Sequence, residues 1–150
     1  LQAAVLLPQL EKLDQRNAAR LAAVRRLLAG LGDLPGLRAF AAGLLDEGES
    51  SPAFYKVGFH YDAAVWGLPR KTLVAAARAE GVPLDAGFPA LHVGRSPSRY
   101  RQAGPLPQAE RAHASVVVLH HPVLLAGDQV IDQVAAALRK IHRHRAELAG

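Results

Sequence analysis

The sequence contains no cysteine and no methionine, and aromatic residues make up only 5% of its 150 positions. Without cysteine, the fold depends on neither disulfides nor thiolate metal sites. No apolar run has the length that a membrane-spanning helix requires, and the first residues do not form a signal-peptide pattern. These absences favour a cytoplasmic protein, and the missing methionine indicates a piece of a longer protein.

Basic residues exceed acidic ones, which gives a net charge of +5, but they are spread along the chain rather than gathered. They occur near the start, in a central loop and at the C-terminal end. No aromatic residues alternate with them in the way that would stack nucleic-acid bases. The charge alone therefore does not favour contact with nucleic acid.

Apolar residues with a helical period mark the helices. Leucine and valine recur every three or four residues up to position 31, which predicts one long helix over 1–31 that Pro8 kinks or divides. A second pattern predicts a closing helix over 127–148, with Asp128 as its N-cap. Shorter helices are expected at two further places, 68–81 and 108–115.

Two segments have clear strand character. Residues 53–62 are rich in aromatic and valine side chains that suit a half-buried pleated surface, and 116–122 form a buried apolar run. A loop rich in Pro, Gly and Ser spans 89–107, and loops of this length are usually functional or disordered. Two weaker strands are expected at 37–43 and 82–88, and a polar loop at 46–52. This order predicts an α+β fold, with a small, mostly antiparallel sheet and helices on one face.

Five phrases span almost the whole chain: LQAAVLLPQLEKLDQRNAAR, LPGL, RKTLVAAARAEGVPLDAGFPALH, QAERAHAS and LLAGDQVIDQVAAALRKI. Each alone is weak, because helices rich in leucine and alanine are common. Together, and in this order, they resemble the C-terminal small domain of the DegT/StrS family of pyridoxal-phosphate-dependent aminotransferases. The resemblance implies that residues 1–150 are this domain of a fold-type-I transferase, opening with a long interdomain helix over about 1–31.

The phrase LHHPVLLAG differs from the usual LP that the family shows at the end of this strand. It resembles the branch that contains 3-amino-5-hydroxybenzoate synthase and the aminocyclitol aminotransferases of antibiotic biosynthesis. The resemblance implies a homodimer in which glutamate or glutamine gives its amino group to the cofactor, and a keto sugar or keto-cyclitol then receives it. The alternative is a non-catalytic α+β interaction or regulatory domain that contacts nucleic acid.

The resemblance also places the cofactor lysine and most phosphate contacts in an N-terminal domain that this chain lacks. A lysine that forms a Schiff base must be desolvated or lie near another cation. Lys56 falls in a strand without a Gly-rich phosphate cradle nearby, and the other lysines fall on helices: Lys12, Lys71 and Lys140. We therefore expect no catalytic residue in this chain and no activity of the chain alone.

His92 is the leading candidate for substrate binding, because it begins the long loop and such loops often carry binding groups. The resemblance implies that this loop contributes to the mouth of the active site. Phe88 and Tyr100 flank His92 and are expected to line the binding site of an apolar or ring-shaped substrate. Ordinary packing for the aromatic residues, and a surface turn for His92, are the alternatives. The arginines of the loop are expected to be solvated: Arg95, Arg99 and Arg101.

His120 and His121 end the apolar run of 116–122. Alternation along a strand places the two on opposite faces, and no nearby Asp, Glu or Cys in the sequence completes a metal shell. We therefore expect no metal site. A structural role is predicted, in which an imidazole satisfies a buried backbone group, and lining a substrate pocket is the alternative.

Two further patterns carry simpler expectations. His142 and His144 lie two residues apart on a helix and do not share a face, so the sequence HRHR is predicted to be a solvated helix end. Tyr61 and Trp66 are large and amphipathic, and are predicted to pack this domain against another one.

Overall fold

The computed structural model describes residues 2–40, 45 and 52–149. Its elements in chain order are α1 (Gln2–Leu10), α2 (Leu13–Leu31), β1 (Leu37–Ala39), β2 (Lys56–Tyr61), α3 (Ala63–Trp66), α4 (Arg70–Ala79), β3 (Leu84–Asp85), the 3₁₀ turn η2 (Pro97–Arg99), α5 (Pro107–Ser115), β4 (Val116–His120), the 3₁₀ turn η3 (His121–Leu125), α6 (Asp128–Arg143) and α7 (Arg145–Leu148). None of these helices is long and apolar enough to cross a membrane.

The four strands form one sheet in the order β1-β2-β4-β3, and every neighbouring pair is antiparallel. Phe59 in the middle of β2 lies opposite Ala39 of β1 and Val117 of β4. The short strand β3 joins through Leu84, which lies opposite Leu119. The predicted α+β fold with a small antiparallel sheet is confirmed.

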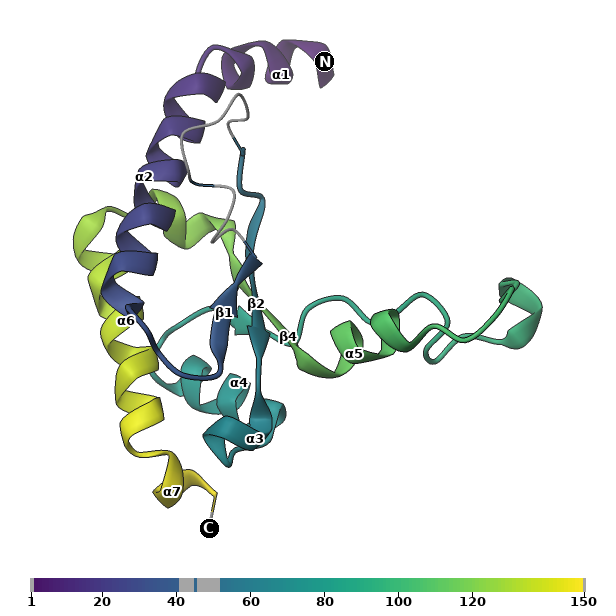
Figure 1. Ribbon diagram of the computed structural model, residues 1–150. Helices are drawn as coiled ribbons and strands as arrows, with labels where there is room; N and C mark the ends of the chain where they lie inside the picture. The colour runs from purple at the N-terminus through teal and green to yellow at the C-terminus, as the bar shows by residue number, and fades with distance from the viewer. Residues whose placement is uncertain (1, 41–44, 46–51, 150) are drawn as a thin grey trace.

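One face of the sheet carries the core. Along β2, Val57, Phe59 and Tyr61 are buried, while the alternating positions point to the other face. The helices α2 and α6 lie side by side along the molecule (Figure 1) and, with α4, supply the rest of the core. Each of these three helices contributes a leucine that is at most 1% exposed: Leu27, Leu73 and Leu138. The other face of the sheet carries α5, the side chain of His60, and Phe40, whose ring lies over Gly58.

The long helix predicted over 1–31 is interrupted at Glu11 and Lys12. Pro8 lies inside α1, so the interruption follows the proline rather than coinciding with it. The buried residues of α2 begin at Ala23, whereas residues 4–10 of α1 are all exposed and α1 is joined to α2 by the hydrogen bond from Arg16 to Gln9. The large apolar side chains of α1 are at least 60% exposed: Val5, Leu6, Leu7 and Leu10.

The ends of several elements differ from the predictions for local reasons. The strand predicted over 116–122 ends at His120, because Pro122 cannot donate to the ladder and the chain turns into η3. The N-cap of α6 is Gly127, and Asp128 is its first helical residue. The predicted strand 37–43 is observed over Leu37–Ala39. Its residues 41–43, like nearly all of the predicted polar loop, lie outside the described part of the chain.

Helix α3 was not predicted from the sequence. Asp62 caps it, because its Oδ1 accepts hydrogen bonds from the amides of Ala64 (2.9 Å) and Val65 (3.2 Å). Gly67 ends the helix in the left-handed conformation, at a φ of 62°. This single turn folds Trp66 back beneath the sheet.

The prediction that Tyr61 and Trp66 face another domain is wrong, since they are only 3% and 1% exposed. The Tyr61 hydroxyl donates to the Leu68 carbonyl at 2.6 Å, and burial, with a smaller effect of Asp62, raises the pKa of Tyr61 to about 12. The Trp66 indole donates to the Pro35 carbonyl at 2.7 Å. Strand alternation and the α3 turn, which the prediction overlooked, direct both rings inward.

His142 also departs from the predicted solvated helix end. Its ring packs edge-on against Trp66, with the centroids 4.7 Å apart. Burial, with a smaller contribution from Arg145, lowers the pKa of His142. His144 is the solvated member of the pair and contacts Glu147 at 2.9 Å.

Candidate functional site

Residues 86–115, here called the arm, comprise a loop, η2 and α5 and project from the side of the sheet (Figure 1). Arg70 on α4 holds the base of the arm. Its Nη1 donates to three carbonyl oxygens, those of Ala86 (3.1 Å), His113 (2.6 Å) and Val116 (3.0 Å). Because Ala86 begins the arm and the other two residues end it, one guanidinium anchors both of its ends.

His92 lies inside the arm and faces α5. Its Nε2 is 3.6 Å from Oε1 of Glu110, and its side chain is only 14% exposed. The rings of His92 and Tyr100 are tilted to each other, with centroids 6.3 Å apart. A further contact across the arm joins the amide of Ala90 to Nδ1 of His113 at 3.3 Å. The structure thus brings two of the predicted site residues, His92 and Tyr100, together with an acid that the sequence did not single out.

Phe88 contacts a different group of residues at the start of β2. Its ring is 71% exposed and lies 4.5 Å, centroid to Nζ, from the ammonium of Lys56. This distance is within the range of a cation–π contact. The neighbouring Tyr55 stacks on His121, with centroids 5.2 Å apart. Phe88 therefore belongs to an exposed cluster with Tyr55, Lys56 and His121 at one end of the sheet. The loop arginines Arg95, Arg99 and Arg101 are exposed, as predicted.

The expectation that no acid lies near His120 is wrong. Nε2 of His120 is hydrogen-bonded to Oδ2 of Asp85, and the other carboxylate oxygen accepts from Arg78. Antiparallel pairing places Asp85 opposite Val118, which puts it diagonally beside His120 on the same face of the sheet. The hydrogen bond from His120, followed by those from Arg78, lowers the pKa of Asp85. The imidazole therefore pairs with a carboxylate rather than with a buried backbone group.

The described residues offer no cluster of metal ligands. Within 2–40, 45 and 52–149, no group of three or more His, Cys, Asp and Glu side chains is placed to hold a metal ion. The His120–Asp85 pair supplies only two such groups. The pair therefore holds the His120 imidazole in one orientation through its hydrogen bond to Asp85.

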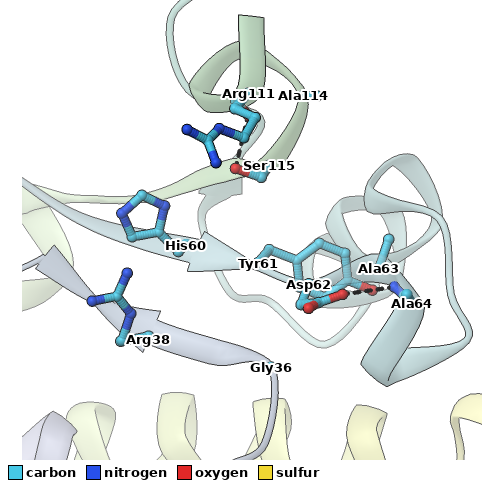
Figure 2. Close-up of a pocket in the computed structure, with 10 residues that line it drawn as sticks. All are labelled: Gly36, Arg38, His60, Tyr61, Asp62, Ala63, Ala64, Arg111, Ala114 and Ser115. Atoms are coloured by element: carbon cyan, nitrogen blue, oxygen red, sulfur yellow. Dashed lines mark hydrogen bonds between the residues drawn. The ribbon is translucent and has the colours of Figure 1, made fainter. Parts of the chain in front are cut away.

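A cavity of about 590 Å³ lies between α5 and the β1–β2 edge of the sheet. Figure 2 shows that the guanidinium groups of Arg38 and Arg111 point into it from opposite sides, with His60 between them. Arg38 and His60 are register partners on β1 and β2, and Arg111 comes from α5. None of these three residues was predicted from the sequence as part of a site. The alternation of the phrase KVGFHY, which places His60 on the face away from the core, was the available signal.

Comparisons with known proteins identify the chain's relatives. Residues 1–139 match the DegT/DnrJ/EryC1/StrS aminotransferase family. The L-glutamine:2-deoxy-scyllo-inosose aminotransferase of Streptomyces fradiae is 34% identical over 99% of this chain and 38% of its own length. The enzyme of the same name from Streptoalloteichus tenebrarius is 31% identical over 98% of this chain and 38% of its own length. The chain thus spans well under half the length of these relatives.

Solved structures agree with the sequence relatives. The crystal structure of DesI with its TDP-sugar product superposes with a TM-score of 0.71 at 28% identity, covering 95% of this chain and 35% of DesI. 3-Amino-5-hydroxybenzoic acid synthase superposes with a TM-score of 0.69 at 25% identity, covering 92% of this chain and 37% of the synthase. The fold is therefore one that solved aminotransferases contain. The chain belongs to the DegT/DnrJ/EryC1/StrS aminotransferase family.

The aminotransferases of this family depend on pyridoxal phosphate. The surroundings of the four lysines decide whether any of them could form the Schiff base with this cofactor. Lys140 donates to Glu80 at 2.8 Å and is 59% exposed, Lys12 and Lys71 are exposed, and Lys56 lies over Phe88. None of these four lysine side chains is buried. A Schiff-base lysine needs desolvation or a neighbouring cation. The described residues therefore do not fit a covalent cofactor site.

Proposed function

We propose that the protein containing this chain is a pyridoxal-phosphate-dependent aminotransferase that moves an amino group from glutamine or glutamate to a keto-cyclitol. The observation that carries this proposal is the match, over nearly the whole chain, to enzymes named for L-glutamine and 2-deoxy-scyllo-inosose. A keto sugar is the second candidate acceptor, supported by the likeness to DesI, whose structure contains a TDP-sugar product.

In this proposal residues 1–150 form the C-terminal small domain of a cytoplasmic homodimer, and a preceding N-terminal domain binds the cofactor. Two observations support this division: the chain covers about two fifths of its relatives' length, and its lysines do not fit a cofactor site. The arm would place His92 and Tyr100 on the substrate side of the active site, with Phe88 on the adjoining sheet end. His92 is suited to bind a ring hydroxyl or carbonyl, because an imidazole can both donate and accept a hydrogen bond.

The test uses a longer protein that contains this chain together with the sequence encoded before it. With pyridoxal phosphate and L-glutamine, this protein should aminate 2-deoxy-scyllo-inosose. Mass spectrometry of the product should detect the aminated ring. A TDP-linked keto sugar in place of the cyclitol tests the second acceptor, and the 150-residue chain alone is the inactive control. Amination of neither acceptor by a folded, cofactor-loaded protein would contradict the proposal.

A further inference from the structure

The cavity shown in Figure 2 gathers nitrogen-bearing side chains from three separate elements. Arg38 lies on β1, His60 on β2 and Arg111 on α5, yet all three line one hollow of about 590 Å³. That volume is within the range of sites that bind small molecules. These residues are distant in sequence, so only the fold brings them together.

The position of His60 is set by its neighbours. Its ring meets that of Phe40 edge-on, with centroids 4.4 Å apart. Phe40 lies across the sheet over Gly58, where an added Cβ would come within 2.6 Å of the phenyl ring. Glycine at position 58 therefore allows Phe40 to support the imidazole, which keeps His60 directed along the cavity wall.

The acid that lines the cavity is not paired with either guanidinium group. Asp62 is also a lining residue, but its Oδ1 accepts from two amides at the start of α3. Arg111 donates to a neutral group, the side-chain carbonyl of Gln108. Within the described part of the chain, Arg38 makes no side-chain hydrogen bond or ion pair. Two guanidinium groups thus face the cavity with no carboxylate paired to either of them.

We propose that this cavity binds the oxyanion group of a small ligand, either a carboxylate or a phosphate. A guanidinium offers paired N–H donors in a plane that matches both groups, and charge-assisted bonds of this kind are among the strongest in proteins. Arg38 and Arg111 approach the anion from opposite sides, and His60 donates a third hydrogen bond between them. The site lies apart from His92, Tyr100 and Phe88, so this inference does not depend on the proposed function.

The test is an NMR titration of the isotope-labelled 150-residue chain at constant ionic strength maintained with sodium chloride. Inorganic phosphate is the ligand in one arm and L-glutamate in the other, which separates a phosphate site from a carboxylate site. The ring signals of His60 and the Nε–H signals of Arg38 and Arg111 should shift and saturate in at least one arm. Shifts that never saturate, in both arms, overturn the proposal.

A charge-matched pair of double variants separates this site from the general positive charge of the protein. Arg38→Gln with Arg111→Gln should raise the Kd at least tenfold, whereas Arg99→Gln with Arg101→Gln on the arm should leave it within twofold. Because all four arginines are exposed, both proteins should keep the wild-type backbone spectrum. His60→Gln alone should weaken binding at least threefold. Equal weakening by the two double variants would refute a specific site.

Discussion

Arg70 is predicted to hold the arm in place, and replacing it should loosen the arm before the core. In Arg70→Met, the carbonyls of Ala86, His113 and Val116 lose their shared donor. Hydrogen bonds to a charged group contribute about 1.5–3 kcal/mol, and we take about 2 kcal/mol because one half-buried nitrogen serves all three oxygens. For a chain of this size, that corresponds to a fall in Tm of about 4–8 °C.

The loss of the Arg70 hydrogen bonds should also lower the local stability of the arm. A change of about 2 kcal/mol in the opening free energy corresponds to roughly thirtyfold faster amide exchange, since each 1.4 kcal/mol is a factor of ten. Hydrogen exchange read by mass spectrometry should show this acceleration in peptides from 86–115. The exchange rates of buried amides in α6 should rise only by the amount that the fall in global stability predicts.

Lys71→Met provides the control. It removes the same charge from the neighbouring position of α4, where the side chain is exposed. This variant should keep its Tm within about 1 °C and the exchange rate of the arm unchanged, as surface substitutions usually do. If Arg70→Met behaves like Lys71→Met in both measurements, the reasoning about the anchor is refuted.

Three other predictions concern the cofactor, pH and the two histidine sites. Mixing the isolated chain with pyridoxal phosphate and reducing with borohydride should give no stoichiometric lysine adduct by peptide mapping; one fully modified lysine would show that the assignment of the cofactor to another domain is wrong. Because the folded pKa of Asp85 is lowered, its pairing stabilises the protein above the unfolded pKa, near 4, and this stability is lost as the pH falls through the folded pKa. The stability difference between wild type and Asp85→Asn, from urea denaturation, should therefore shrink below about pH 4, and a constant difference from pH 7 to 2 would contradict this. In the longer protein, His92→Ala should lower kcat/KM tenfold to a hundredfold at near-normal Tm, whereas His120→Ala should lower Tm and leave turnover near normal; the reverse pattern would move the substrate site to the end of β4.

Local patterns in the sequence predicted the elements that form the core. The stripe of α6 appears in the structure as buried Val134, Leu138 and Ile141, and the run at 116–122 is the buried strand β4. The helix is visible in its own periodicity and the strand in its short, continuous apolar run, and both signals can be seen in a single sequence. The fold class followed from their order.

The missed contacts of His120 and His60 depend on register between distant segments. Asp85 meets His120 only because β3 pairs with β4, and Arg38 meets His60 only because β1 pairs with β2. Periodicity along one segment cannot give these pairings. The assignment of Trp66 to an interdomain contact failed for a local reason, because the single turn of α3 that directs the ring inward was overlooked.

Trp66 is the only tryptophan in the sequence, and it is 1% exposed. Its indole lies at the junction of three parts of the chain. It donates a hydrogen bond to the Pro35 carbonyl and packs edge-on against the rings of Tyr61 and His142. The tryptophan fluorescence of the protein, excited selectively over that of its three tyrosines, therefore comes from one indole in one environment. A blue-shifted emission band will report that the turn before β1, the end of β2 and the last turns of α6 are assembled, without any attached label.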